Sequence, residues 1–394
     1  MRKGWEYKKL GEVATFINGD RGKNYPSAKD FVESGVPFIN AGHLNNGIIR
    51  YDKMNYITIN KYNSLGSGKI IKNDILFCLR GSLGKYAIVA EDSMGAIASS
   101  LVIIRPFQNA DNRFIAHFLS SAKIKEYIAK NNNGSSQPNL SAKSVASFII
   151  PLPTLSTQLA IVSELDKINE LIRLKKEQLK DFDNLAQSLF YEMFGDPVEN
   201  EKGWEAKKLG EIGEFKNGLN FSKDENGHSI KFLGVSDFQN KKSIASDQLD
   251  CISLSECVQE DYLLKTGDIV FVRSNGKKEL IGRSVKMYIT EPTTYSGFCI
   301  RCRITDEKVD KDYIAILLKT PIIRQFMTNS GRGCNISNLN QKILNSIPTI
   351  LPPLPLQRLF AQRIEQIERE KSEVQKSIQD LETLLASRMQ YWFE

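Results

Sequence analysis

The chain contains KGWEYKKLGE at residues 3–12 and KGWEAKKLGE at residues 202–211. Nine of these ten positions are identical, at an offset of 199 residues. A fixed offset of this kind indicates a duplicated architecture, and two copies of 199 residues account for the chain of 394. Further matches at offsets of 194 to 199 are Asp74–Phe77 with Asp268–Phe271, Asn139–Leu140 with Asn338–Leu339, and Pro153–Gln158 with Pro352–Gln357.

Each copy ends in a stretch with the pattern of a long helix. Residues 156–194 lack glycine and proline, and their apolar residues step by four and three. Such a heptad seam predicts a helix of about 38 residues, or about 57 Å, which is too long for its own domain to cover. We therefore expect the two helices to pair, with Lys175 and Lys371 interrupting the seam to fix the register. The seam positions are Ile161, Leu165, Ile168, Ile172, Lys175, Leu179, Phe182, Ala186, Leu189 and Met193, then Phe360, Ile364, Ile367, Lys371, Val374, Ile378, Leu381, Leu385, Arg388 and Trp392.

The rest of each copy mixes short apolar runs with turn residues. Val36–Ile39, Asp74–Phe77 and Ser100–Ile104 are predicted strands, and residues 113–130 and 312–329 are predicted helices. The fold class is therefore α/β (α+β), with two mixed or mainly-β globular domains and two long helices. The predicted parts are a domain at 1–155, a helix at 156–195, a linker at 196–203, a domain at 204–356 and a helix at 357–394.

The composition is that of a globular protein, with 41% hydrophobic and 25% charged residues. No apolar run approaches the ~20 residues of a membrane helix, and Met1–Glu6 does not resemble a secretory signal. Six cysteines suit reduced thiols. These features favour a cytoplasmic protein without a membrane partner.

The positive charge is concentrated in the globular parts. The chain carries a net charge of +7; residues 1–155 carry +9 and residues 204–356 carry +3, whereas the two helices together carry −3. A nucleic-acid surface is therefore expected on the globular parts, and the helices are expected to make protein contacts.

Metal and redox chemistry have little support in the sequence. His43, His117 and His228 lie far apart, without metal-ligand spacing. Cys299 and Cys302 have C-x-x-C spacing, but they lie in an alternating strand pattern that places them on opposite faces. Neither group is expected to bind a metal.

Other catalytic motifs are also incomplete. No G-x-x-x-x-G-K-[ST] phosphate loop occurs, and no amino-methylating tetrapeptide is present. Glu6–Lys8 and Glu205–Lys207 match the E-x-K part of a nuclease pattern, but no suitably placed upstream aspartate completes it. The sequence therefore predicts a binding protein and not an enzyme.

The order of these motifs, repeated twice and followed each time by a long helix, resembles the specificity subunits of type I DNA restriction–modification systems. The resemblance covers the full chain. It departs from the family pattern at Thr157 and Leu356, where an acidic residue is usual, and at Arg273–Gly276, which lacks the full loop motif of the first copy. The motifs that carry it are Trp5 with Lys9–Glu12 and its copy, Val36–Asn40, Asp74–Phe77, Arg80–Gly84 and Ile149–Gln158.

The resemblance implies two pseudo-two-fold-related target-recognition domains, each reading one half of a bipartite asymmetric site in double-stranded DNA. An antiparallel coiled coil would separate them. Two modification subunits would methylate adenines with S-adenosylmethionine, and restriction subunits would use ATP and Mg. This chain would bind none of these cofactors.

Arginine and lysine suit guanine, and asparagine and glutamine suit adenine, so we selected such residues in polar, glycine-containing loops. The repeated Asn139 and Asn338 also fit a structural role. The DNA-binding candidates are Arg21, Lys23, Asn24, Asn40, His43, Arg80, Ser82, Lys85, Ser136, Gln137 and Asn139 in the first copy, and Asn220, Lys223, Ser236, Asp237, Gln239, Arg273, Asn275, Lys277, Lys278, Arg283, Arg332 and Asn335 in the second.

Apolar residues outside the seam mark a predicted partner surface on the long helices, although some of them would alternatively dock on the chain's own domains. These residues are Val162, Leu171, Leu174, Leu185, Phe190, Leu384 and Met389.

Three alternatives stay open at this point: a protein-binding coiled-coil scaffold, a nuclease with an unrecognised site, and a specificity subunit of a methylation-only system. The duplication makes one geometric prediction as well. Because only the short linker Gly195–Gly203 separates Phe194 from Trp204, a two-fold arrangement brings Trp392 and Phe393 close to residues 3–5.

Overall fold

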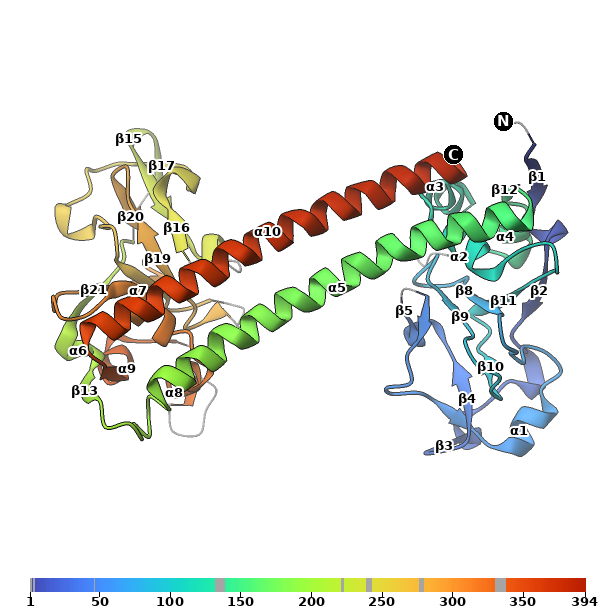
Figure 1. Cartoon of the computed structure of the whole chain (residues 1–394), viewed down its shortest axis with the longest axis horizontal. Helices are drawn as coiled ribbons and strands as arrows, with labels where there is room; N and C mark the ends of the chain where they lie inside the picture. The colour runs from blue at the N-terminus through green and yellow to red at the C-terminus, as the bar shows by residue number, and fades with distance from the viewer. Residues whose placement is uncertain are drawn as a thin grey trace. The chain divides into compact units, whose positions relative to one another are not determined.

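The computed structural model describes residues 2, 4–45, 47–131, 139–220, 223–238, 243–275, 280–329 and 338–394. It divides into two compact units (Figure 1). The first unit comprises Met1–Glu177 with Gln375–Glu394, and the second comprises Gln178–Val374. Each unit therefore holds one globular part and one stretch of each long helix.

The first unit has a main antiparallel sheet, a second sheet and two small strand pairs. Its described helices are α1 (Ile59–Ser64), α2 (Asn112–Ser120), α3 (Ala122–Asn131) and α4 (Ala142–Ala146). The main sheet has the order β2 (Ala14–Asn18), β11 (Leu101–Pro106), β8 (Ile75–Cys78), β9 (Tyr86–Ile88). The second has the order β10 (Ala96–Ile97), β4 (Val36–Ile39), β7 (Tyr56–Ile57), β3 (Phe31–Val32). The pairs are β1 (Glu6–Lys9) with β12 (Ile149–Leu152), and β5 (Leu44–Asn45) with β6 (Ile48–Ile49).

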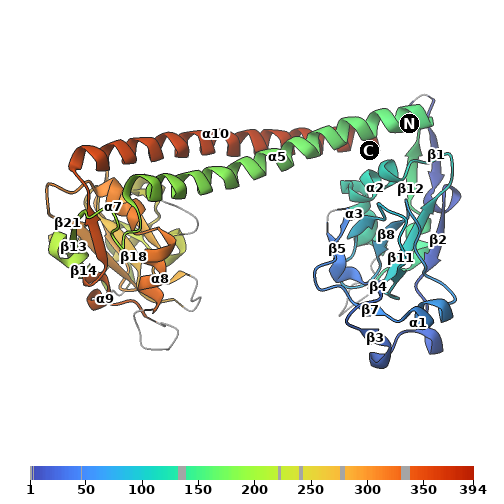
Figure 2. The same cartoon turned by 60° about the horizontal axis from the view of Figure 1, so that its bottom comes forward.

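The main sheet of the first unit is buried on both faces. Ile75 and Phe77 of β8 pack in a core with residues of α2 and of the first turns of α5 (Leu155–Phe194). Figure 2 shows α2 and the start of α5 on the same side of this sheet. Leu76 and Cys78 point to the other face, into a core that includes Ile39 of the second sheet. This explains why β8 is an uninterrupted apolar run and not an alternating one.

The second unit repeats this plan with different details. Its described short α-helices are α6 (Leu209–Ile212), α7 (Lys311–Leu317), α8 (Pro321–Asn329) and α9 (Gln341–Asn345). The main sheet has the order β14 (Gly213–Asn217), β21 (Cys299–Ile304), β18 (Ile269–Val272), β19 (Ser284–Tyr288), β16 (Ser243–Ala245). The other strands are β17 (Cys251–Leu254), β15 (Lys223–Leu233) and β20 (Thr293–Tyr295) in one sheet, and β13 (Glu205–Lys208) with β22 (Pro348–Leu351).

The two cysteines of the C-x-x-C spacing lie on opposite faces of β21, as predicted. Cys302 packs with Ile300 in the core beneath the helices, and Cys299 packs in the core on the other face. Burial raises the pKa of both thiols to about 12. Because the two side chains point to opposite faces of β21, they are not placed to share a metal ion or to form a disulfide with each other.

Each main sheet contains the same buried ion pair. Asp74 accepts hydrogen bonds from Nε and Nη2 of Arg105 at 2.7 and 2.8 Å. Asp268 accepts the equivalent bonds from Arg303 at 2.8 and 2.7 Å. Both carboxylates are at most 2% exposed, so these bidentate pairs satisfy charges that water cannot reach.

The start of each long helix is fixed by a buried glutamine. Gln158 Oε1 accepts a hydrogen bond from the Asp111 backbone N–H, and Gln357 Oε1 accepts one from that of Asp310. These aspartates in turn are the N-caps of α2 and α7. The repeated Gln158 motif is therefore a structural joint between a domain and its long helix.

Helices α5 and α10 (Leu354–Phe393) each span 40 residues and pack against each other in antiparallel directions within each unit. In the first unit, Glu164 binds Arg388 and Lys176 binds Glu382. In the second, Lys371 Nζ lies 2.5 Å from Asp183 Oδ1. All twenty predicted seam positions are buried or half-buried, so the heptad prediction is confirmed.

Two helix predictions were too long. The predicted helix at 113–130 is α2 followed by α3, because Ser121 has the extended ψ of 159°. The predicted helix at 312–329 is α7 followed by α8, which begins at Pro321. Proline disfavours a helical conformation in the residue before it, which explains this break. The predicted strands at 36–39, 74–77 and 100–104 correspond to β4, β8 and β11.

The end of each long helix lies beside the start of a domain, as the duplication predicts. Trp392 stacks on Trp5, with ring centroids 6.1 Å apart and planes 4° from parallel. In the second unit, Trp204 Nε1 donates to the Phe194 carbonyl at 2.9 Å. Within the described residues, no helix is long and apolar enough to cross a membrane.

Candidate nucleic-acid interface

The strand register of the first unit gathers several candidate loops at one edge of its main sheet. Asn18 at the end of β2 pairs with Val102, and Cys78 at the end of β8 pairs with Leu101. The ends of β2 and β8 therefore meet the start of β11. The segments 19–24 and 79–85 that follow these strands lie at this edge, which we call the first strand-end edge.

Two more segments reach the first strand-end edge. The Ala98 backbone N–H donates to the Ile39 carbonyl at 2.8 Å, which brings the turn after β4 there. A Cβ on Gly19 would lie 2.6 Å from the Ala98 carbonyl oxygen, so the β2 loop passes directly over this turn. Arg80 and Asn139 form an isolated bridge, which adds the segment ending at residue 139.

Most described candidates at this edge are open to solvent. Arg21, Lys23, Arg80, Ser82, Lys85 and Asn139 are exposed, and Asn24 is half-buried. Asn40 and His43 instead stabilise their own turn. Asn40 Oδ1 accepts from the Gly42 N–H at 2.8 Å. The His43 ring is buried between the Asn40 N–H and the Lys53 carbonyl. We therefore leave these two residues out of the proposed contact surface.

The second unit has an equivalent second strand-end edge. Asn217 at the end of β14 pairs with Ile300, and Val272 at the end of β18 pairs with Cys299. The Ser296 N–H donates to the Leu233 carbonyl at 3.0 Å, which brings the turn after β15 to the same edge. The same topology thus assembles the same loops in both units.

The candidates at this edge differ in exposure. Asn220 and Ser236 are exposed, whereas Arg273, Asn275 and Arg283 are half-buried. Asp237 Oδ2 accepts from the Gly234 N–H at 2.7 Å, so it also fixes its turn. Lys223 is the first residue of β15. The candidates Ser136, Gln137, Gln239, Lys277, Lys278, Arg332 and Asn335 lie outside the described residues.

The departure from the loop motif at Arg273–Gly276 has a structural counterpart. Arg273 occupies the place of Leu79 and not that of Arg80. The Leu140 N–H donates to the Leu79 carbonyl at 2.9 Å, and the Leu339 N–H donates to the Arg273 carbonyl at 2.8 Å. The two arginines therefore leave the sheet one residue apart and are not equivalent.

The turn at 66–69 also lies at the first strand-end edge, although none of its residues is among the candidates predicted from the sequence. The Gly66 N–H donates to Asp20 Oδ2 at 2.7 Å, and Ser67 Oγ donates to the Asn18 carbonyl at 2.7 Å. The signal was present in the Gly-Ser-Gly-Lys tetrapeptide, which combines turn residues with a basic side chain.

The predicted partner surface on the long helices is partly present. Leu171, Leu174, Leu185 and Leu384 are 46–50% exposed. The prediction of an uncovered surface is wrong for Val162 and Phe190, which are buried in the cores of their own units because the adjacent domain covers that side of the helix. Met389 is half-buried against the first unit's core.

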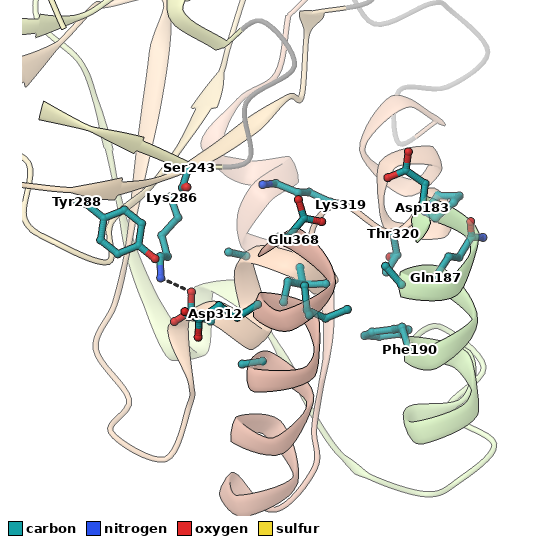
Figure 3. Close-up of a pocket in the computed structure, with 17 residues that line it drawn as sticks. Asp183, Gln187, Phe190, Ser243, Lys286, Tyr288, Asp312, Lys319, Thr320 and Glu368 are labelled. Carbon is teal, nitrogen blue, oxygen red and sulfur yellow. Dashed lines mark hydrogen bonds and ion pairs between the residues drawn. The ribbon is translucent and has the colours of Figure 1, made fainter. Parts of the chain in front are cut away.

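A cavity of about 420 Å³ lies in the second unit between α5, α7, α10 and β19 (Figure 3). Ala186, Phe190 and Ile364 form part of its apolar wall. Lys286 at its side binds Asp312. Burial lowers the pKa of Lys286, but the hydrogen bond to Asp312 raises it, and the net shift of the pKa is upward. The amine therefore stays protonated, which makes it a poor nucleophile.

Within the described ranges, no group of three or more metal-binding side chains comes together. The cavity also lacks any of the DNA-binding candidates. The strand-end edges, and not the cavity, therefore hold the candidate functional residues of the described chain.

Comparison with known proteins agrees with this architecture. The model of the type I restriction modification DNA specificity domain matches twice, at residues 2–181 and 201–383. The chain belongs to this family. Type I specificity subunits are the non-catalytic component of their restriction–modification enzymes.

The similarity extends over nearly whole chains. The StySPI specificity subunit of Salmonella potsdam is 24% identical, over 99% of this chain and 88% of that protein. The EcoKI specificity subunit of Escherichia coli K12 is 24% identical, over 96% and 85%.

Solved structures show the same fold. The type I S subunit from M. genitalium has a TM-score of 0.55 and 16% identity, covering 99% of this chain and 96% of that one. A chain from a study of complex assembly in the type I R-M system has a TM-score of 0.66 and 19% identity, covering 99% and 97%. Two mixed α/β domains with two long packed helices are thus the shared fold of this specificity subunit and these proteins.

Proposed function

We propose that this specificity subunit reads a bipartite, asymmetric DNA site, with one half-site for each strand-end edge. The observation that carries the proposal is the convergence, in two homologous units, of polar and basic loops at the same edge of the sheet. The loops differ in sequence between the units, with Arg80 and Lys85 in one and Asn220 and Arg273 in the other. Two different half-sites follow from that divergence.

The charge distribution supports DNA as the ligand. The first globular part carries a net charge of +9 and contributes exposed Arg21, Lys23, Arg80 and Lys85 to its edge. Basic side chains at phosphates supply affinity, and base edges supply specificity. A scaffold that binds only protein would not need this basic edge.

Methylation-sensitive sequencing of genomic DNA tests the proposal. A strain that expresses the chain with its partner subunits should carry methylated adenines in one bipartite motif with two unlike halves. Deletion of the chain should remove that methylation completely. A contiguous motif, or methylation that persists after deletion, would contradict the proposal.

Replacement of Arg80 by alanine should weaken recognition of one half-site only. If Arg80 binds a guanine through its guanidinium, the loss should be about 1–3 kcal/mol of binding free energy for the correct base. Competition binding with single-base variants of the mapped site measures this effect. Lys72→Ala is the matched control, because Lys72 is exposed near the opposite end of β8. A uniform loss on every sequence would leave Arg80 only a phosphate contact.

We also propose that the exposed leucines of α5 and α10 bind two modification subunits, which methylate adenine with S-adenosylmethionine, and that restriction subunits with ATP and Mg join this complex in the cytoplasm. No cofactor is assigned to this chain. The support is the uncovered apolar surface at Leu171, Leu174, Leu185 and Leu384, beyond the paired seam.

Replacement of both Leu171 and Leu174 by glutamate should abolish co-purification with the modification subunits. Both side chains are 47% exposed, so the change puts charges in the interface without emptying the chain's core. Leu155→Glu is the control, since Leu155 is 43% exposed at the other end of the first-unit stretch of α5. Unchanged assembly by the double variant, together with unchanged circular dichroism, would exclude this surface.

A methylation-only system is the second candidate, because the proposed DNA-reading edges and helix surface would serve a complex with modification subunits alone. ATP-dependent cleavage of unmethylated target DNA by the complex purified from its host separates the two. Cleavage requires a restriction subunit, and its absence beside full methylation supports the methylation-only system.

A further inference from the structure

We infer that Phe298 is a specificity-determining residue of the second strand-end edge, and that its ring makes an apolar contact with the 5-methyl group of a thymine. This inference rests on the proposed DNA-reading function. It assigns a base contact to an aromatic side chain in a place where the sequence analysis selected only polar residues.

Phe298 lies in the middle of the second strand-end edge. It immediately precedes β21, and its carbonyl accepts hydrogen bonds from the N–H groups of Arg273 and Ser274 at 2.8 and 3.4 Å. The neighbouring Gly297 N–H donates to the Leu219 carbonyl at 2.8 Å. The candidate loops after β14 and β18 therefore flank Phe298 on both sides.

The backbone at this position is firmly held, while the ring is open to solvent. The Phe298 N–H donates to Ser296 Oγ at 3.2 Å, and Cys299 and Ile300 next to it are fully buried. Phe298 itself is 61% exposed. A fixed backbone limits the conformational entropy that the residue would lose on contact with a ligand.

The globular part of the second unit exposes few large apolar side chains. Among its described residues, Tyr288 and Phe298 are the large apolar side chains that are exposed, at 43% and 61%. Tyr288 ends β19, at the far end of that strand from the second strand-end edge, and it lines the cavity. Among the described residues of the second strand-end edge, Phe298 is thus the exposed large apolar side chain, which matches the one apolar feature that a base pair shows in the major groove, the thymine methyl.

The first unit has a polar residue at the same place. Leu79 donates its N–H to the Ser100 carbonyl at 2.8 Å, as Arg273 does to Phe298. Ser100 therefore replaces Phe298 at the first strand-end edge. This difference is what two edges that read unlike sequences require, since the strands next to this position pair in the same way in both units.

The test uses the full chain assembled with its modification subunits and a duplex that carries the mapped site. Each thymine of the half-site read by the second unit is replaced in turn by deoxyuridine, which lacks only the 5-methyl group. Dissociation constants are measured for the unchanged chain, Phe298→Ala and Phe107→Ala. Phe107 is the matched control, because it is 45% exposed but follows β11, at the opposite edge of the first unit's sheet.

At one thymine position, deoxyuridine should weaken binding by the unchanged chain about fourfold, the effect of one buried methyl group. Phe298→Ala should lose at least as much on the thymine duplex and show no further loss with deoxyuridine at that position. Phe107→Ala should behave like the unchanged chain. This non-additivity identifies a direct contact.

Two results would overturn the inference while leaving the proposed function intact: sequence-specific binding that Phe298→Ala does not change, or a loss that is equal for thymine and deoxyuridine at every position. A complex that shows no preference between the mapped site and unrelated DNA would instead remove the proposed function itself.

Discussion

Insertion of four residues into both long helices should move methylation from the original site to one with a longer spacer. The insertion points are between Glu177 and Gln178 in α5 and between Val374 and Gln375 in α10, where the two units divide. The added helix is about 6 Å long at 1.5 Å per residue. This equals one to two base-pair steps of about 3.4 Å, so the half-sites should stay the same while the spacer grows by one or two pairs.

Methylation-sensitive sequencing measures the outcome. Four inserted residues add one further four-residue interval to the apolar heptad repeat. A coiled coil accommodates such an insertion by a local change of its winding. Insertion in α5 alone is the control, since it puts the two seams out of register and should abolish methylation of both sites. If the double insertion still methylates the original spacing, the paired helices do not set the distance between half-sites.

Replacement of Asp268 by alanine should be the most destabilising of the substitutions considered. Asp268 is 2% exposed, and it accepts both bonds from Arg303 and a third from the Lys265 N–H at 2.7 Å. Without this carboxylate, the mostly buried Arg303 guanidinium has no acidic partner. The free energy of unfolding should therefore fall by about 3–5 kcal/mol. Urea unfolding of the full chain, followed by fluorescence and circular dichroism, measures the loss of unfolding free energy.

Two matched variants make this result specific. Asp74→Ala removes the equivalent carboxylate in the first unit and should have a similar effect. Glu365→Ala removes a helix-surface pair with Arg369, whose side chains are 64% and 76% exposed, and should cost less than about 1 kcal/mol. A cost for Asp268→Ala no larger than that of Glu365→Ala would show that the buried pair contributes little.

The sequence was most informative where one periodicity ran over many residues. The seam from Ile161 to Met193 and its copy identified the long helices and their pairing, because burial along a helix repeats every three or four residues. The alternation around Cys299 and Cys302 placed those thiols on opposite faces for the same kind of reason. Local breaks were harder: Ser121 ends α2 without a proline or glycine to signal it.

Side-chain roles at the candidate site depended on contacts distant in sequence. His43 lies in a polar loop, which suggested a DNA contact, but its ring is buried and its Nε2 lies 3.2 Å from the carbonyl oxygen of Lys53, ten residues away. Val162 and Phe190 were predicted to be exposed because they lie outside the heptad seam, but they are buried in the hydrophobic cores of the first and second units. The one-residue shift between Arg80 and Arg273, by contrast, already follows from the match of Asp74–Phe77 with Asp268–Phe271 at an offset of 194 residues.

The division of the chain has a consequence for biosynthesis. The second unit is one continuous segment, whereas the first unit is completed only by the last twenty residues, including Phe393 within its core and Trp392 against Trp5. A chain that emerges from the ribosome in order can therefore finish its second domain before its first. The domain made first must wait, partly assembled and with part of its core unfilled, until translation reaches the end of α10.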